Sequence, residues 1–156
     1  MSKGKREVIS DWLMLLGAPI LLGSLFLAWS HQFSPGFVAR YAHTPALNGL
    51  PRDPTAWQVY SVVDVLLAVL ALALLAVALR GARPARVAVL LGLMVAVAFT
   101  WHALGRPPTR GADLFDPSLS PPGYTPNHPT AGAGEVVALV GLGLGIGGVL
   151  VSFTAD

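Results

Sequence analysis

Four apolar stretches, separated by polar and proline-rich segments, dominate the chain. They cover residues 12–30, 59–79, 87–105 and 135–153. Each is close to the ~20 residues that an α-helix needs to cross a hydrocarbon core of ~30 Å. None shows the strict alternation of apolar and polar residues that is typical of membrane-barrel strands. The pattern therefore predicts an all-α fold, in which residues 1–156 form one domain with a bundle of four transmembrane helices.

The connections between these stretches differ in length. The segment 80–86 is short, which predicts an antiparallel hairpin of the second and third helices. The other two connections, 31–58 and 106–134, are long for a compact bundle and are rich in proline. Aromatic residues are scarce in disordered segments but are spread through both loops. We therefore expect the two loops to be ordered and to cap one end of the bundle.

The composition supports a lipid-embedded protein. Charged residues make up 12% of the chain, about half of the usual fraction of ~25% in soluble domains. The absence of cysteine excludes disulfides, thiolate metal sites and iron–sulfur clusters. With a net charge of +2 and no dense basic stripe, the chain is not expected to bind nucleic acid. Membrane lipid is the expected surrounding.

Lysine and arginine flank the apolar stretches unevenly. One side carries Lys3, Lys5, Arg6, Arg80, Arg83 and Arg86 on short segments. The other side has four arginines spread over the two long loops. The positive-inside rule then predicts cytoplasmic N- and C-termini and extracytoplasmic loops. The first stretch is longer than a signal-peptide core, so we expect it to be retained. Abundant Arg, Ala, Gly and Pro favour a GC-rich bacterial genome, hence a bacterial cytoplasmic membrane.

Small residues form one stripe on the fourth predicted helix. They recur at spacings of three and four residues, at Gly134, Ala138, Gly141, Gly145 and Gly148. Such a stripe lets helix backbones approach closely in lipid. Two interpretations are open. The stripe packs against a neighbouring helix of the same bundle, or it is a self-association face between protomers.

Four ionisable residues lie near the loop-side ends of the four predicted helices, and they form a candidate polar cluster: His31, Asp64, His102 and Glu135. Each also has a structural interpretation. Asp64 can hydrogen-bond near a helix end, His31 and His102 can lie at the membrane interface, and Glu135 suits the first turn of a helix. An acid inside an apolar stretch is costly. We therefore expect Asp64 to face the bundle interior and to pair with His102 or with a loop backbone group.

Two histidines and two carboxylates at one depth could bind zinc or another divalent metal, and His31 with His102 could ligate a haem. However, no local metal signature such as HxxxH or ExxH occurs, nor do the motifs GxSxG, Walker A, GxGxxG or HExxH. No cofactor, metal or catalytic residue is therefore predicted.

Two segments carry a family resemblance: Ser24-Leu25-Phe26-Leu27-Ala28-Trp29, and Ala56-Trp57-Gln58-Val59-Tyr60-Ser61-Val62-Val63-Asp64-Val65-Leu66-Leu67. In them the chain resembles the small uncharacterised four-helix membrane proteins common in actinobacteria, over about a quarter of its length. That resemblance implies the fold and brings no activity with it. The layout is also similar to that of claudins, with Trp29 and Gly49-Leu50 at corresponding places. Because the further tryptophan and the cysteine pair of claudins are missing, this second likeness concerns topology alone.

Three functional hypotheses follow. The first is a non-enzymatic accessory or scaffold subunit, or a self-assembling module, that contacts partners through the outer loops and the glycine-rich helix. The protein would then be a homo-oligomer or a subunit of a membrane complex. The second is an oligomeric channel or small transporter that uses Asp64. The third is a membrane enzyme or a metal or haem carrier at the polar cluster.

Overall fold

The computed structural model describes residues 3–110 and 129–155, and its long helices are those that the apolar pattern predicts. They are α1 (Lys3–Ser24), α4 (Val63–Arg80), α5 (Arg83–Gly105) and α6 (Ala133–Ala155). All four are long and apolar enough to cross a membrane. The chain is thus a multi-pass membrane protein by the length and composition of its helices.

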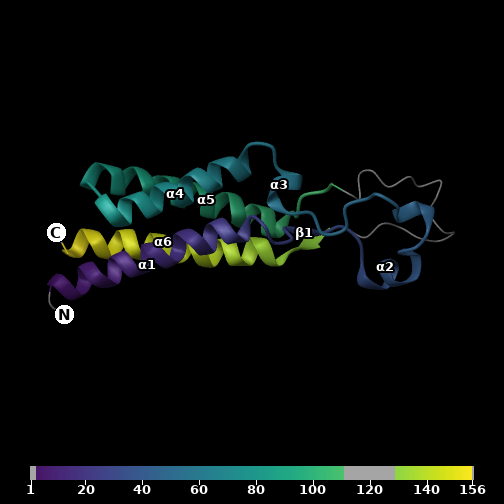
Figure 1. Ribbon diagram of the computed structural model, residues 1–156, viewed down its shortest axis with the longest axis horizontal. Helices are drawn as coiled ribbons and strands as arrows, with labels where there is room; N and C mark the ends of the chain where they lie inside the picture. Colours follow the sequence, from purple (N-terminus) through teal and green to yellow (C-terminus); the bar gives the residue numbers. More distant parts are fainter. Residues whose placement is uncertain (1–2, 111–128, 156) are drawn as a thin grey trace.

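Both termini and the α4–α5 turn lie at one end of the bundle, and the two long connections lie at the other, which we call the loop end (Figure 1). The first connection contains β1 (Ser30–His31), α2 (Pro35–Tyr41), the 3-10 helix η1 (Pro45–Leu47) and α3 (Ala56–Val59). The second ends in β2 (Thr130–Ala131). Phe115 and Tyr124, on which the expectation of an ordered second loop partly rests, lie outside the described residues.

The bounds predicted for the first helix are wrong at both ends. Helix α1 begins at Lys3 rather than at residue 12, and it ends at Ser24 rather than at residue 30. At its end the chain folds back, and the buried Trp29 ring donates from Nε1 to the Ser24 carbonyl over 2.9 Å. The Trp29 backbone N–H donates to the Pro54 carbonyl over 2.9 Å. The N–H groups of Leu25, Phe26 and Leu27 are bonded to the last turn of α1, and Trp29 is held by contacts beyond the helix.

The second predicted helix is divided in the structure. Residues Ala56–Val59 form the separate short helix α3, and the membrane-spanning α4 begins only at Val63. The Thr55 backbone N–H donates to Gln58 Oε1 over 3.0 Å, which fixes the start of α3 as in a capping box. The other two helices begin slightly earlier than predicted, at Arg83 and Ala133.

The small-residue stripe of α6 packs against α1. Its members Gly134, Ala138, Gly141, Gly145 and Gly148 are all buried. The two backbones approach so closely that a Cβ at Gly17 of α1 would lie 2.8 Å from the Gly141 carbonyl oxygen. This close approach agrees with packing within one bundle, the first of the two interpretations. The face is occupied by the chain's own α1 at Gly141 and Gly148, and by Leu74 of α4 and Leu93 of α5 at Gly145.

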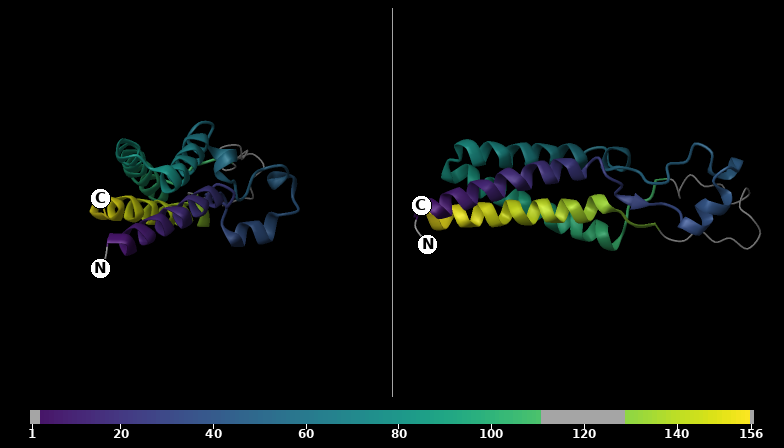
Figure 2. Two further views of the ribbon diagram at one scale, coloured as in Figure 1. Left: turned by 60° about the vertical axis from the view of Figure 1, so that its left-hand side comes forward. Right: turned by 60° about the horizontal axis from the view of Figure 1, so that its bottom comes forward.

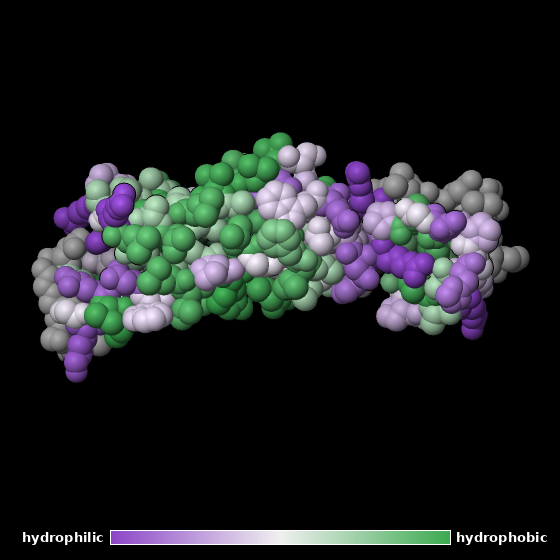
Figure 3. All heavy atoms as spheres, viewed as in Figure 1, coloured by the Kyte–Doolittle hydropathy of each residue, from purple (hydrophilic) through white to green (hydrophobic). Residues whose placement is uncertain are grey.

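The hairpin of α4 and α5 covers this pair. Helix α4 lies against α1 and α5 against α6, whereas α4 and α5 contact each other least of these pairs. The two helices meet at the Gly81–Ala82 turn and diverge toward the loop end (Figure 2). Large aliphatic side chains such as Leu66, Leu72 and Leu91 remain exposed on their outer faces. On the face that Figure 3 shows, an apolar band lies between two more polar ends.

A two-stranded antiparallel pair joins the two long connections. Ser30 of β1 pairs with Ala131 of β2, and His31 pairs with Thr130. Beside it, the N–H groups of Gly132 and Gly134 donate to the carbonyls of Trp29 and Ala28 over 3.0 and 2.8 Å. The N–H of Gly134, in the first turn of α6, has no partner within its own helix. The chain after α1 supplies that partner through the Ala28 carbonyl.

Candidate functional site

The first connection forms a small structural unit of its own at the loop end, residues 33–52, which we call the cap unit. Ser34 is the N-cap of α2, since its Oγ accepts from the Phe37 N–H over 3.3 Å, and Pro35 suits the first helical position. Phe33, Phe37 and Leu47 form a buried apolar cluster that is separate from the core of the bundle. The cap unit therefore has a core independent of the membrane helices.

Gln32 holds the cap unit to the bundle and to the second connection. Its side chain is 1% exposed. Its Nε2 donates to Ser30 Oγ over 2.6 Å and to the Pro108 carbonyl over 2.9 Å, and its Oε1 accepts from the Arg110 N–H over 2.8 Å. The Gln32 N–H donates in turn to the Arg52 carbonyl over 2.9 Å. The sequence pattern did not single out this residue, because a lone glutamine in a loop carries no local signal.

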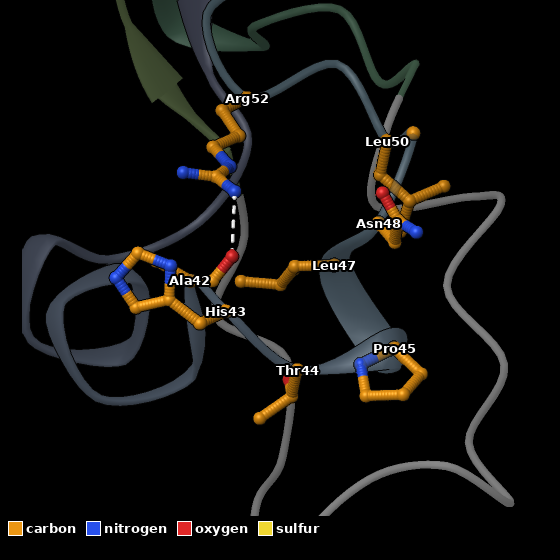
Figure 4. A pocket seen from close by; sticks show the side chains of 9 residues that line it. Ala42, His43, Thr44, Pro45, Leu47, Asn48, Leu50 and Arg52 are labelled. Atoms are coloured by element: carbon orange, nitrogen blue, oxygen red, sulfur yellow. Dashed lines mark hydrogen bonds between the residues drawn. The ribbon is translucent and has the colours of Figure 1, made fainter.

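A pocket of about 430 Å³ opens beside η1 in the cap unit (Figure 4). It is lined by Ala42, His43, Thr44, Pro45, Leu47, Asn48, Gly49, Leu50 and Arg52. Arg52 Nη2 donates to the Ala42 carbonyl over 3.0 Å and so closes one side of the pocket. The carboxyl-terminal side of η1 turns at Gly49, which has a φ of 74° that glycine adopts at no steric cost. The pocket is thus a surface depression with a mixed polar and apolar lining.

His31 belongs to a surface ion pair. Its Nδ1 lies 2.6 Å from Asp53 Oδ1, and both side chains are well exposed. A pair of this kind contributes little to stability because water and salt screen it. His31 is therefore placed at the rim of the loop end, with a partner that the sequence pattern did not indicate.

Asp64 lies inside the bundle, with 3% of its surface exposed. Its Oδ1 accepts from the Val65 backbone N–H over 2.8 Å, in the first turn of α4. An acid in this position is stabilised by the helix dipole. The expected pairing with His102 is wrong, because His102 is exposed on α5 and Asp64 accepts its hydrogen bond from its own helix. Asp64 can therefore be buried because it lies in the first turn of its own helix, and it needs no partner on a neighbouring helix.

Glu135 is the most unusual of the four candidates. It lies in the first turn of α6 and is fully buried. Within residues 3–110 and 129–155, neither of its carboxylate oxygens has a hydrogen-bond partner. A buried polar group without a partner costs about 1–3 kcal/mol. The helix dipole accounts for an acid at this position, but not for the missing hydrogen bonds.

Tyr60 is the titratable neighbour of Glu135. It lies between α3 and α4, where its ring contacts Trp29 edge-on at 5.7 Å and Phe99 at 5.3 Å between ring centroids. Burial raises the pKa of Tyr60 to about 12, and the nearby Glu135 carboxylate acts in the same direction. Three aromatic rings from the fold-back, the α3–α4 junction and α5 thus close the bundle at the depth of Glu135.

The structure does not gather the four candidates into one site. His31 is bound to Asp53 at the surface, His102 is exposed, and Asp64 is bonded to its own helix. Among the described residues, no three His, Cys, Asp or Glu side chains are grouped so that they could hold a metal ion. Glu135 alone is both buried and without a hydrogen-bond partner in that part of the chain.

Comparison of the chain with protein-family models, with curated proteins and with solved structures finds no match.

Proposed function

We propose that this protein is a non-enzymatic accessory or scaffold subunit of a membrane complex, and that the cap unit is the surface that binds its partner. The membrane is the cytoplasmic membrane of a bacterium. The termini face the cytoplasm and the cap unit lies outside, as the distribution of lysine and arginine favours. The complex is either a homo-oligomer or an assembly with another membrane protein.

The separate core of the cap unit carries this proposal. Fixing the backbone of each residue costs about 1–2 kcal/mol of conformational entropy. A connection that only joins α1 to α4 needs no such ordering. Here residues 33–52 contain two helical segments and a buried cluster of Phe33, Phe37 and Leu47, and the preceding Gln32 anchors them. Ordered loops on a rigid scaffold are where proteins commonly place their binding residues.

The packing of the bundle supports the same surface. The glycine stripe of α6 is used by α1, so it is not available for a partner. We therefore propose the cap unit, rather than the glycine-rich helix, as the surface that binds the partner. The channel hypothesis loses its main support as well, since Asp64 is bonded within its own helix. The cap unit remains as the structured part that extends beyond the membrane helices (Figure 1).

Phe37→Ala tests the proposal. Phe37 is 5% exposed, and its ring contacts that of Tyr41 in a tilted arrangement with 4.9 Å between centroids. Removing it costs about 3–5 kcal/mol in a packed core, and Phe37 belongs to the cluster of the cap unit rather than to the core of the bundle. Purified from its native membrane in mild detergent, the wild-type protein should elute as a complex heavier than a 16.3 kDa monomer with bound detergent. Phe37→Ala should elute as the monomer, with its helical circular dichroism unchanged.

Leu72→Ala is the matched control, because it shortens an exposed side chain of α4 outside the cap unit. It should keep the complex. The mass of the complex distinguishes a homo-oligomer from an assembly with another protein. A strictly monomeric wild-type protein, or a Phe37→Ala variant that keeps the full complex, would contradict the proposal.

A further inference from the structure

An apolar groove of about 710 Å³ runs between α4 and α5 on the outside of the bundle. Its α4 wall extends from Val63 to Ala73 and its α5 wall from Ala88 to Phe99, and every lining residue is apolar or glycine. It exists because the helices diverge toward the loop end and because small residues line its inner side. A Cβ added at Gly92 would lie only 2.9 Å from Leu70 Cδ1, so the Leu70 side chain already fills this position.

Two basic side chains continue the groove wall of α5 at the loop end. Val95, Phe99 and His102 follow one another at spacings of four and three residues, so they share one face of α5, and Arg106 follows directly at its C-cap. His102 and Arg106 are exposed, and within residues 3–110 and 129–155 neither has an ion pair. The neighbouring Trp101 is 68% exposed, as expected at the level of lipid headgroups.

The length of the groove fits one half of a bilayer. The distance from Ala88 to Phe99 along α5 is about 16 Å at 1.5 Å per residue. One leaflet contributes about 15 Å of a hydrocarbon core of ~30 Å. An acyl chain that enters at Phe99 can therefore lie along the whole groove, with its headgroup beside His102 and Arg106.

We infer that the groove binds one acyl chain of a phospholipid, whose phosphate is bound by His102 and Arg106. Charge-assisted hydrogen bonds from a guanidinium group to phosphate are among the stronger polar contacts in proteins. The apolar wall and the basic end thus match the two chemical parts of such a lipid. A site of this kind would give His102 a role, although His102 has no part in the pairing with Asp64 that the sequence suggested.

A helix of another protein fits this groove less well. An acyl chain is flexible and can follow the apolar walls of the groove, whereas a helix would need side chains shaped to fit them. A partner helix would also leave His102 and Arg106 beside one of its ends, with no anionic group defined for them to bind. The groove is therefore assigned to lipid, and a helix of a second copy becomes one outcome of the test.

Native mass spectrometry of the full chain, released from nanodiscs, tests the inference. The probes are dioleoylphosphatidylglycerol, dioleoylglycerol without phosphate, and inorganic phosphate. We expect one retained phosphatidylglycerol for each protein chain, weaker retention of dioleoylglycerol, and no retention of phosphate alone. Ala88→Phe fills the groove from an exposed position and should lower retention about tenfold, which is about 1.4 kcal/mol. Ala98→Phe, also exposed on α5 but outside the groove, should not.

The headgroup contact has its own variants. Arg106→Gln combined with His102→Gln should lower retention of phosphatidylglycerol about tenfold and leave dioleoylglycerol unchanged, whereas Arg40→Gln in the cap unit should change neither. Equal retention by Ala88→Phe and wild type would overturn the inference, as would equal binding of both lipids by the wild type. A Val95→Cys variant, in a chain with no other cysteine, would overturn it by forming disulfide-linked dimers in the bilayer, because a second copy would then occupy the groove.

Discussion

Gly141 is the position where one added carbon tests the packing of α6 on α1. A Cβ there would lie 2.7 Å from the Leu21 backbone nitrogen and 3.0 Å from the Gly17 carbonyl oxygen. Ordinary contacts between carbon atoms lie at about 3.5–4.0 Å. Since both neighbours are backbone atoms, no side-chain rotation can relieve the contact. The two helices have to separate by several tenths of an ångström over the whole interface.

Gly143 supplies the matched control. It lies on the same helix, and a Cβ there would meet nothing within 4 Å. Replacing glycine by alanine in a helix gains about 0.8–1.0 kcal/mol in helix propensity, and this gain is shared by both variants. Overpacking costs about 1–3 kcal/mol and falls on Gly141→Ala alone. The free energy of unfolding should therefore be about 1–3 kcal/mol lower for Gly141→Ala than for Gly143→Ala.

Thermal unfolding in mild detergent, followed by circular dichroism at the helix band, measures this difference. For a chain of this size, each kcal/mol corresponds to a change of about 2–4 °C in Tm. Gly143→Ala should unfold at or above the wild-type temperature, and Gly141→Ala clearly below it. If Gly141→Ala were as stable as Gly143→Ala, the close approach of α1 and α6 would not exist, and the reasoning from backbone contact would fail.

Three further predictions concern other parts of the chain. Glu135→Leu should raise the free energy of unfolding by about 1–3 kcal/mol, because it removes a buried carboxyl group without hydrogen bonds. A Tm below that of the wild type would mean that the carboxyl group has a stabilising partner. The raised pKa of Tyr60 adds stability that is complete below pH 10 and is lost as pH rises from 10 to about 12. The fall in Tm over this pH range should therefore be smaller in Tyr60→Phe than in the wild type. Equal falls in the two proteins would argue against burial of the Tyr60 hydroxyl. Single cysteines at Asn48 and Ala82 should react differently with an impermeant thiol reagent on intact cells, with labelling only at Asn48, whereas labelling only at Ala82 would mean inverted topology.

The hydrophobic pattern alone predicted the membrane helices correctly in number and approximate place. The reason is physical, because a bilayer requires about 20 apolar residues and leaves a backbone no partner outside its own helix. The turn between α4 and α5 followed from its length, and the close-packing role of the α6 stripe followed from the size of its residues. These features depend on residues that are near one another in the sequence.

The tertiary structure alone decided what each segment contacts. The apolar residues after Ser24 leave the helix because Trp29 bonds back to it and pairs with Pro54. The glycine stripe meets α1 rather than another copy, and Gln32 binds Pro108 across the two connections. Glu135 is buried without a partner although its place in a first turn looks ordinary. Each of these results joins segments far apart along the chain, and their contact energies leave no trace in local periodicity.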